Sequence, residues 1–175
     1  WGGFQSDLSH NAPTPEERQL ADDLLSLLMP VIKGYGTDKG YEVCTNMQQV
    51  FGGHGYVEEW GMSQRVRDAR IAQIYEGANG IQALDLLGRK VLLQSKGKAV
   101  RDFTADVLKF CGRHARDKQM RRYVWDLTKL CAQWNYLTTR IMLTARKDRD
   151  IVSSACYDFL MYSGYVTMAY FWALQ

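Results

Sequence analysis

Hydrophobic residues recur every three or four positions along most of the chain, which is the spacing of one face of an α-helix. The first such stripe follows the segment 14–17, Thr-Pro-Glu-Glu, which is typical of a helix N-terminus because it offers a capping hydroxyl, a proline and a glutamate that reaches back. The stripe comprises Leu20, Leu24, Leu27, Leu28, Val31 and Ile32. We expect Pro30 to kink this helix, and Gly34 with Gly36 to end it.

The same spacing predicts further helices over residues 37–50, 62–70 and 78–93, with the glycine cluster at 52–55 ending the first of them. Residues 95–175 are expected to form three more helices. The middle one has a heptad-type seam made of Tyr123, Leu127, Leu130, Trp134, Leu137 and Ile141. The final one carries a stripe made of Ile151, Ala155, Phe159, Tyr162, Val166, Ala169 and Ala173.

No pair of strands is evident, so the chain is predicted to be all-α. Residues 1–13 mix Gly, Ser, Asn, Asp and Pro without a hydrophobic period, and we expect a loop or linker there. Residues 159–175 contain no charge, but they are few and include Ser, Gly, Thr and Tyr, so a buried helix is favoured over a membrane span. Because the chain opens on Trp1 without an initiator Met, we expect it to be a piece of a longer protein.

The composition is that of an ordinary globular protein, with 46% hydrophobic and 23% charged residues. The 22 basic and 19 acidic residues leave a formal charge of +3, which is too small to indicate a nucleic-acid partner. The basic stretch 113–122 lacks aromatic residues for base stacking and is better explained as a solvated helix face or turn. Four widely spaced cysteines and three histidines give no metal-ligand pattern, which favours a reducing compartment and no metal.

Two segments could carry chemistry on physical grounds alone. The glycine cluster at 52–55 would let a phosphate or a ring approach the backbone closely, although on this signal alone a helix stop and tight turn is the favoured explanation. Glu76 lies on a turn bounded by glycine among apolar residues, where a carboxylate can be desolvated enough to act as a general base. The plainer alternative is that Glu76 is a solvated loop residue and that Asn79 caps the next helix.

Three stretches taken together resolve this choice. They read Gln-Val-Phe-Gly-Gly-His-Gly-Tyr at 49–56, Arg-Asp-Ala-Arg-Ile at 67–71 and Ile-Tyr-Glu-Gly at 74–77, and in order, spacing and identity they resemble the C-terminal part of acyl-CoA dehydrogenases. Residues 75–86, followed by a long helical extension, are most similar to the branch that contains 3-methylmercaptopropionyl-CoA dehydrogenases.

The resemblance implies an FAD-dependent oxidoreductase of fatty acid metabolism that forms an α,β-double bond in an acyl-CoA thioester. Glu76 corresponds to the base that removes the α-proton, and Gly77 would lie beside the CoA thioester. The positions that correspond to FAD contacts are Gln49, Phe51, Gly52 and Gly53, toward the cofactor of a neighbouring subunit, and Ala78 with Asn79, toward the flavin diphosphate. The resemblance also implies an up-and-down helical bundle over 14–94 and an additional helical domain over 95–175.

The chain departs from the family at several positions. Many members have Thr in place of Ala78 and Glu or Gln in place of Gly80, so side-chain contacts to FAD would be replaced by backbone contacts. An Arg that often contacts CoA falls one place out of register at Arg89, and no role is assigned to it. Arg67 and Asp68 are expected to form a structural ion pair that holds the loop.

The resemblance further implies partners and a location. We expect an acyl-CoA substrate, self-association into a dimer or tetramer, and an electron-accepting flavoprotein. The bacterial character of the branch, with cysteines that look reduced, favours a bacterial cytoplasmic setting, and the charge pattern favours no nucleic-acid partner. Because the family's N-terminal helical domain and β-domain are missing from these residues, the chain alone is expected to be inactive. The alternative is a free-standing helical interaction or oligomerisation module that derives from the family and has lost the reaction.

Overall fold

The structure is a computed structural model that describes residues 1–175, and it contains helices and no strands. The predicted all-α fold is therefore confirmed. The α-helices are α1 (Gly2–Asn11), α2 (Pro15–Pro30), α3 (Gly36–Val50), α4 (Gly53–Tyr56), α5 (Met62–Ala72), α6 (Asn79–Leu84), α7 (Lys98–His114), α8 (Arg121–Thr144) and α9 (Asp150–Ala173). Two π-helical segments, Val31–Tyr35 and Asp85–Gln94, continue α2 and α6, and Glu58–Trp60 is a 3₁₀ turn.

The N-terminus of α2 has the cap that the sequence predicts. The Thr14 hydroxyl accepts a hydrogen bond from the Glu17 amide at 3.2 Å, and the Glu17 carboxylate accepts one from the Thr14 amide at the same distance. These two bonds satisfy amide groups that a helix N-terminus leaves free. Along the predicted stripe, Leu24, Leu27 and Leu28 are buried.

The expected end of this helix at Gly34 and Gly36 is wrong. The chain continues through the π-helical segment Val31–Tyr35 directly into α3. Gly34 is buried, and a Cβ at this position would lie 2.7 Å from a methyl group of Leu160. This glycine therefore allows α9 to approach closely. Gly52, with a φ of +59°, follows Phe51 at the end of α3.

The expectation of a loop over residues 1–13 is also wrong, because residues 2–11 form α1. This helix has no apolar stripe that a periodicity search could detect. It packs against α2 and buries Gln5, and the ring of Trp1 lies 6.1 Å from that of Phe103 and 5.5 Å from that of Phe171. Tertiary contacts therefore stabilise a helix that the local amino-acid sequence does not predict.

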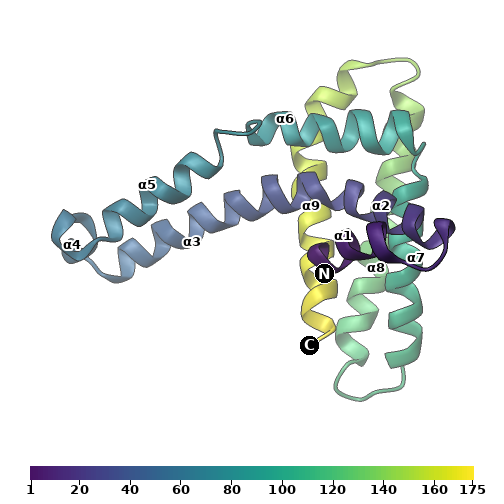
Figure 1. The fold of residues 1–175 in the computed structure, drawn as a ribbon, viewed down its shortest axis with the longest axis horizontal. Coiled ribbons are helices and arrows are strands. Elements are labelled where there is room, and N and C mark those ends of the chain that lie inside the picture. The colour runs from purple at the N-terminus through teal and green to yellow at the C-terminus, as the bar shows by residue number, and fades with distance from the viewer.

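The helices α3, α4 and α5 form an arm that projects sideways from the rest of the molecule (Figure 1). Helices α3 and α5 pair along its length, and the short α4 lies at its tip. No residue of α3 is buried, and α5 buries only Met62 and Ser63 near the tip. The arm thus has no core of its own.

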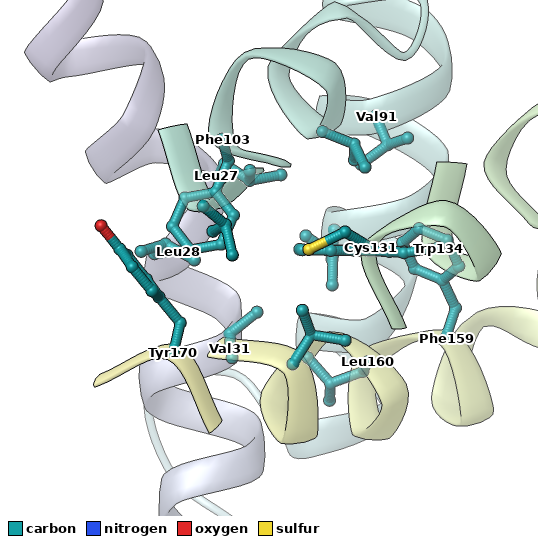
Figure 2. Packing of buried hydrophobic residues seen from close by; sticks show 14 of the residues in the cluster. Leu27, Leu28, Val31, Val91, Phe103, Cys131, Trp134, Phe159, Leu160 and Tyr170 are labelled. Atoms are coloured by element: carbon teal, nitrogen blue, oxygen red, sulfur yellow. The ribbon is translucent and has the colours of Figure 1, made fainter. Parts of the chain in front are cut away.

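The hydrophobic core lies where α2, the segment Asp85–Gln94, α7, α8 and α9 meet (Figure 2). Trp134 on α8 is fully buried, with its ring 5.9 Å from that of Phe103, while Leu160 of α9 points into the same cluster. Of the predicted seam on α8, Leu127 and Trp134 are buried, whereas Tyr123 is 66% exposed. No helix is long and apolar enough to cross a membrane.

One hydrophobic cluster joins residues 14–94 and residues 95–175, which are predicted to be separate domains. Leu27 and Val91 belong to it from the first half, and Phe103, Trp134 and Leu160 belong to it from the second. The division at residue 94 stays a prediction.

Candidate functional site

The loop between α5 and α6 carries Glu76 in an unusual backbone conformation. Glu76 has a φ of +54°, and Gly77 after it has a φ of +86°. A positive φ is uncommon for a residue with a Cβ and costs free energy, so it persists only where the surroundings hold it. The Glu76 side chain is exposed, and the carboxamide of Gln82 donates to the Glu76 carbonyl oxygen at 3.4 Å.

Both ends of this loop are fixed to Asp38 on α3. Gln73 precedes the loop and donates from its carboxamide to Oδ1 of Asp38 at 2.5 Å. Asn79 follows the loop and donates to the same oxygen at 2.6 Å. The backbone N–H of Asn79 also donates to the backbone carbonyl oxygen of Gln73 at 3.3 Å, which closes the loop at its base.

The Asn79 side chain points into the protein and all its polar atoms are engaged there. It is 93% buried, since only 7% of its surface is exposed. Its nitrogen also donates to the Gly34 carbonyl oxygen at 3.1 Å, and its oxygen accepts from Lys33 at 3.0 Å and from Thr37 at 3.2 Å. Ala78 precedes α6 without a side-chain cap, so Asn79 is not the N-cap that the plainer alternative suggested.

Tyr157 on α9 completes this polar cluster. Its hydroxyl donates to Oδ2 of Asp38, the oxygen that the loop residues do not use. That hydrogen bond raises the pKa of Tyr157 to about 12, because it stabilises the protonated hydroxyl beside a carboxylate. Neither Asp38 nor Tyr157 was singled out from the sequence, since they are 119 residues apart and no local pattern links them.

The second group of predicted site residues lies at the tip of the arm. Gln49 and Phe51 are exposed, and Phe51 retains 46% of its accessible surface. Gly52 and Gly53 are exposed too, and a Cβ at either would meet no atom within 4 Å. Behind them, Gly55 is buried with the carbonyl oxygen of Gln48 2.3 Å from where its Cβ would be, so only glycine fits there.

The structure does not bring the two groups together. The 15 residues of α3 separate the base of the arm, where Asp38 and Asn79 meet, from Gly52 at its tip. At 1.5 Å per residue this helix is about 22 Å long. Within one copy of the chain, the two groups are therefore too far apart to contact the same atom.

The residues fit FAD at the tip of the arm and fit it only in part at its base. Phe51 is about half exposed, Gln49 is exposed, and the open backbone at 52–53 leaves room for a cofactor to approach. At the base, Ala78 is exposed. The Asn79 side chain is fully occupied within the protein, so it does not fit a direct contact with a diphosphate.

One expectation about charged residues is wrong. Arg67 pairs with Glu58 through two hydrogen bonds of 2.8 and 3.2 Å, and the expected pairing with Asp68 is absent. The Arg67 guanidinium holds the pKa of Glu58 below its usual range. Arg89 is engaged by Asp85 one helical turn before it. No cluster of three His, Cys, Asp or Glu side chains suited to a metal ion is present.

Comparison with known proteins identifies the family. The acyl-CoA dehydrogenase C-terminal domain matches residues 14–92, and the acetyl-CoA dehydrogenase C-terminal-like domain matches residues 99–175. The chain belongs to the acyl-CoA dehydrogenase family. This family acts on acyl-CoA, depends on FAD and forms oligomers. The resemblance that the motifs indicated is confirmed.

Individual relatives of the family extend the match. A 3-methylmercaptopropionyl-CoA dehydrogenase of Ruegeria pomeroyi is 35% identical over 90% of this chain and 27% of its own length. A butyryl-CoA dehydrogenase of Syntrophomonas wolfei is 36% identical over 59% of this chain and 17% of its own length. The chain thus spans about a quarter or less of these relatives.

A solved structure, the apo form of Bd2924, has a similar fold. It matches 98% of this chain with a TM-score of 0.60, and the match covers 30% of that protein. The sequence identity is 21%, so this likeness concerns the fold alone.

Proposed function

We propose that this chain is the C-terminal part of an FAD-dependent acyl-CoA dehydrogenase and that Glu76 is its catalytic base. The reaction would be α,β-dehydrogenation of an acyl-CoA thioester. The observation that carries the proposal is the strained loop that presents Glu76, with both of its ends fixed to Asp38. Backbone conformations of this kind cluster at active sites, which favours a functional role for Glu76.

The chemistry asks for a well-placed carboxylate. The α-proton of a thioester is only weakly acidic, so its removal needs a base in contact and hydrogen bonds to the thioester carbonyl oxygen. Glu76 would accept the α-proton on its carboxylate, and its own backbone N–H would donate to that carbonyl oxygen. When bound, FAD would supply the acceptor for the hydride that leaves the β-carbon. The double bond between the α- and β-carbons forms as the proton passes to Glu76 and the hydride leaves the β-carbon with its electron pair.

These residues alone would not catalyse the reaction. Glu76 is exposed, whereas a carboxylate that works as a base near neutral pH needs a site from which water is excluded. Gly77 beside it would lie against the CoA thioester. The remaining walls of such a site must come from segments outside residues 1–175, and acyl-chain selection with them.

The tip of the arm supports self-association as part of this function. Gln49, Phe51, Gly52 and Gly53 would contact an FAD that is bound mainly by another copy of the chain, because the length of α3 separates them from Glu76. Ala78 would offer backbone contacts to FAD beside the loop. An electron-accepting flavoprotein would then reoxidise the cofactor.

The location of the protein is proposed on its cysteines. All four are free thiols, which fits a reducing bacterial cytoplasm.

The test is Glu76→Gln in the full-length protein. Turnover of an acyl-CoA should fall by roughly 10²- to 10⁴-fold, the usual contribution of a general base, while the bound FAD stays unchanged. Glu16→Gln is the matched control, since Glu16 is an exposed glutamate in the first turn of α2, outside the loop and outside the arm. Turnover that survives in Glu76→Gln would place the base elsewhere.

A further inference from the structure

The polar cluster at the base of the arm connects the Glu76 loop to the last helix of the chain. Gln73 and Asn79 flank the loop and both donate to Oδ1 of Asp38, at 2.5 and 2.6 Å. Tyr157 donates to Oδ2 of the same carboxylate. One carboxylate therefore joins three donors from three separate segments of the chain.

This arrangement fixes Asp38 from the side that the loop does not reach. A carboxylate on a helix surface can turn about its side-chain torsions, and such a turn would move Oδ1 away from both loop residues. A hydrogen bond from a hydroxyl to a charged carboxylate is among the stronger kinds in proteins. Because Tyr157 lies on α9, whose neighbours Phe159 and Leu160 are buried in the core, its hydroxyl is held by a rigid element.

We propose that Tyr157 is a positioning residue for Glu76, which acts by fixing Asp38 and through it both ends of the loop at 73–79. The inference rests on the proposed function of Glu76. It also assigns a role to the C-terminal helical region, in which the sequence points to no catalytic residue. Tyr157 itself touches neither the substrate nor the reacting atoms in this role.

The experiment compares Tyr157→Phe with Tyr162→Phe in the full-length protein. Both variants remove one hydroxyl from α9, but the Tyr162 hydroxyl donates to the Leu130 carbonyl oxygen on α8, away from the loop. The first measurement is hydrogen exchange of the backbone amides at residues 73–80. Tyr157→Phe should speed this exchange about fivefold, the factor for the loss of a hydrogen bond worth about 1 kcal/mol. Tyr162→Phe should leave it unchanged.

The second measurement is steady-state turnover of an acyl-CoA. In Tyr157→Phe, kcat should fall about fivefold while KM changes less and the FAD content stays near the wild type, because the loop that carries the base is loosened and most of the binding surface would lie outside this loop. A loss that is purely structural would lower the amount of folded protein and the FAD content together. Tyr162→Phe should retain the wild-type kcat.

The two measurements separate the two proposals. Loop exchange in Tyr157→Phe that equals the wild type, or that rises equally in Tyr162→Phe, overturns the positioning role whatever the activity. An unchanged kcat in a loosened loop also overturns it. Absence of turnover in the wild-type protein loaded with FAD would overturn the proposed function, and loop exchange would still decide whether Tyr157 holds the loop.

Discussion

At the scale of single residues, the most constrained side chain of the candidate site is the amide of Asn79. It is buried, and it contacts Lys33, Gly34, Thr37 and Asp38 at once. A buried amide of this kind stabilises the fold when all its partners are present, and removing it leaves those partners without hydrogen bonds.

Asn79→Ala should therefore lower the free energy of unfolding by about 2 kcal/mol, because the buried Gly34 carbonyl and several part-buried polar groups lose their partner. The midpoint of urea unfolding measures this change. Asn46→Ala is the matched control on the exposed surface of α3, and it should shift stability by less than about 0.5 kcal/mol. Equal midpoints for the two variants would contradict the structural role of Asn79.

Because the thiol of Cys131 is buried, we expect the folded protein to lose stability at alkaline pH. Burial in the core raises the pKa of its thiol to about 12, from an ordinary value of 9.0. The unfolded chain therefore loses this proton first as the pH rises, and the folded state becomes less stable from about pH 9 upward.

Urea midpoints between about pH 8 and about pH 10.5 test this. The midpoint should fall in the wild type and should fall less steeply in Cys131→Ala. Burial also raises the pKa of Cys111 and Cys156, so part of the slope should remain. A slope that is identical in the two proteins would mean that Cys131 ionises in the folded state as readily as in the unfolded chain.

The sequence was sufficient to single out Glu76, but it was not sufficient to identify the residues that hold its loop in place. Glu76 and its glycine neighbours are consecutive, so a motif can display them. Asp38, Gln73 and Tyr157 meet only after three segments have folded together, and each is an ordinary polar residue in its own segment. For the same reason the expected pair of Arg67 with Asp68 was wrong, since the partner, Glu58, lies nine positions away along the chain.

At the scale of elements, the long helices were predictable because their apolar stripes face a core. The cap at Thr14 and the buried positions of α8 follow from local rules of this kind. Helix α1 was missed because it lacks such a stripe, and the expected stop at Gly34 was wrong because that glycine is needed for close packing. A glycine looks the same in sequence whether it ends a helix or lets another helix approach.

A pair of helical glycines makes this distinction measurable. A Cβ on Gly164 of α9 would lie 2.2 Å from ring atoms of Tyr35, so Gly164→Ala should destabilise the protein by about 1–3 kcal/mol through overpacking. A Cβ on Gly112 of α7 would meet nothing within 4 Å, so Gly112→Ala should stabilise it by about 0.5 kcal/mol. Thermal unfolding reports both signs, and a stabilising Gly164→Ala would contradict the close contact between α9 and Tyr35.

At the scale of the whole molecule, the arm is the part that lacks a core. It exposes apolar side chains on α3, among them Val43, Met47 and Val50, which are 58%, 43% and 75% exposed. Exposed apolar surface of this extent on one element is typical of a surface that another chain or domain covers. A piece of a dehydrogenase should have such a surface, whereas a free-standing module should not.

The chain of residues 1–175 should therefore bind a hydrophobic dye such as ANS or self-associate in solution. The double variant Val43→Ser with Met47→Ser should weaken either effect, because it removes apolar surface from the arm. Leu93→Ser, at a position that is 75% exposed outside the arm, is the control. A monodisperse chain that binds no dye would favour the interaction module over the dehydrogenase.

The arm also has a mechanical consequence. It is anchored at one end only, so it behaves as a lever whose pivot is the cluster of Asp38 and Asn79. With a length of about 22 Å, a rotation of about 10° at the pivot would carry the tip through about 4 Å. A small rotation at this pivot would therefore become a large displacement of Phe51 and Gly52 at the tip.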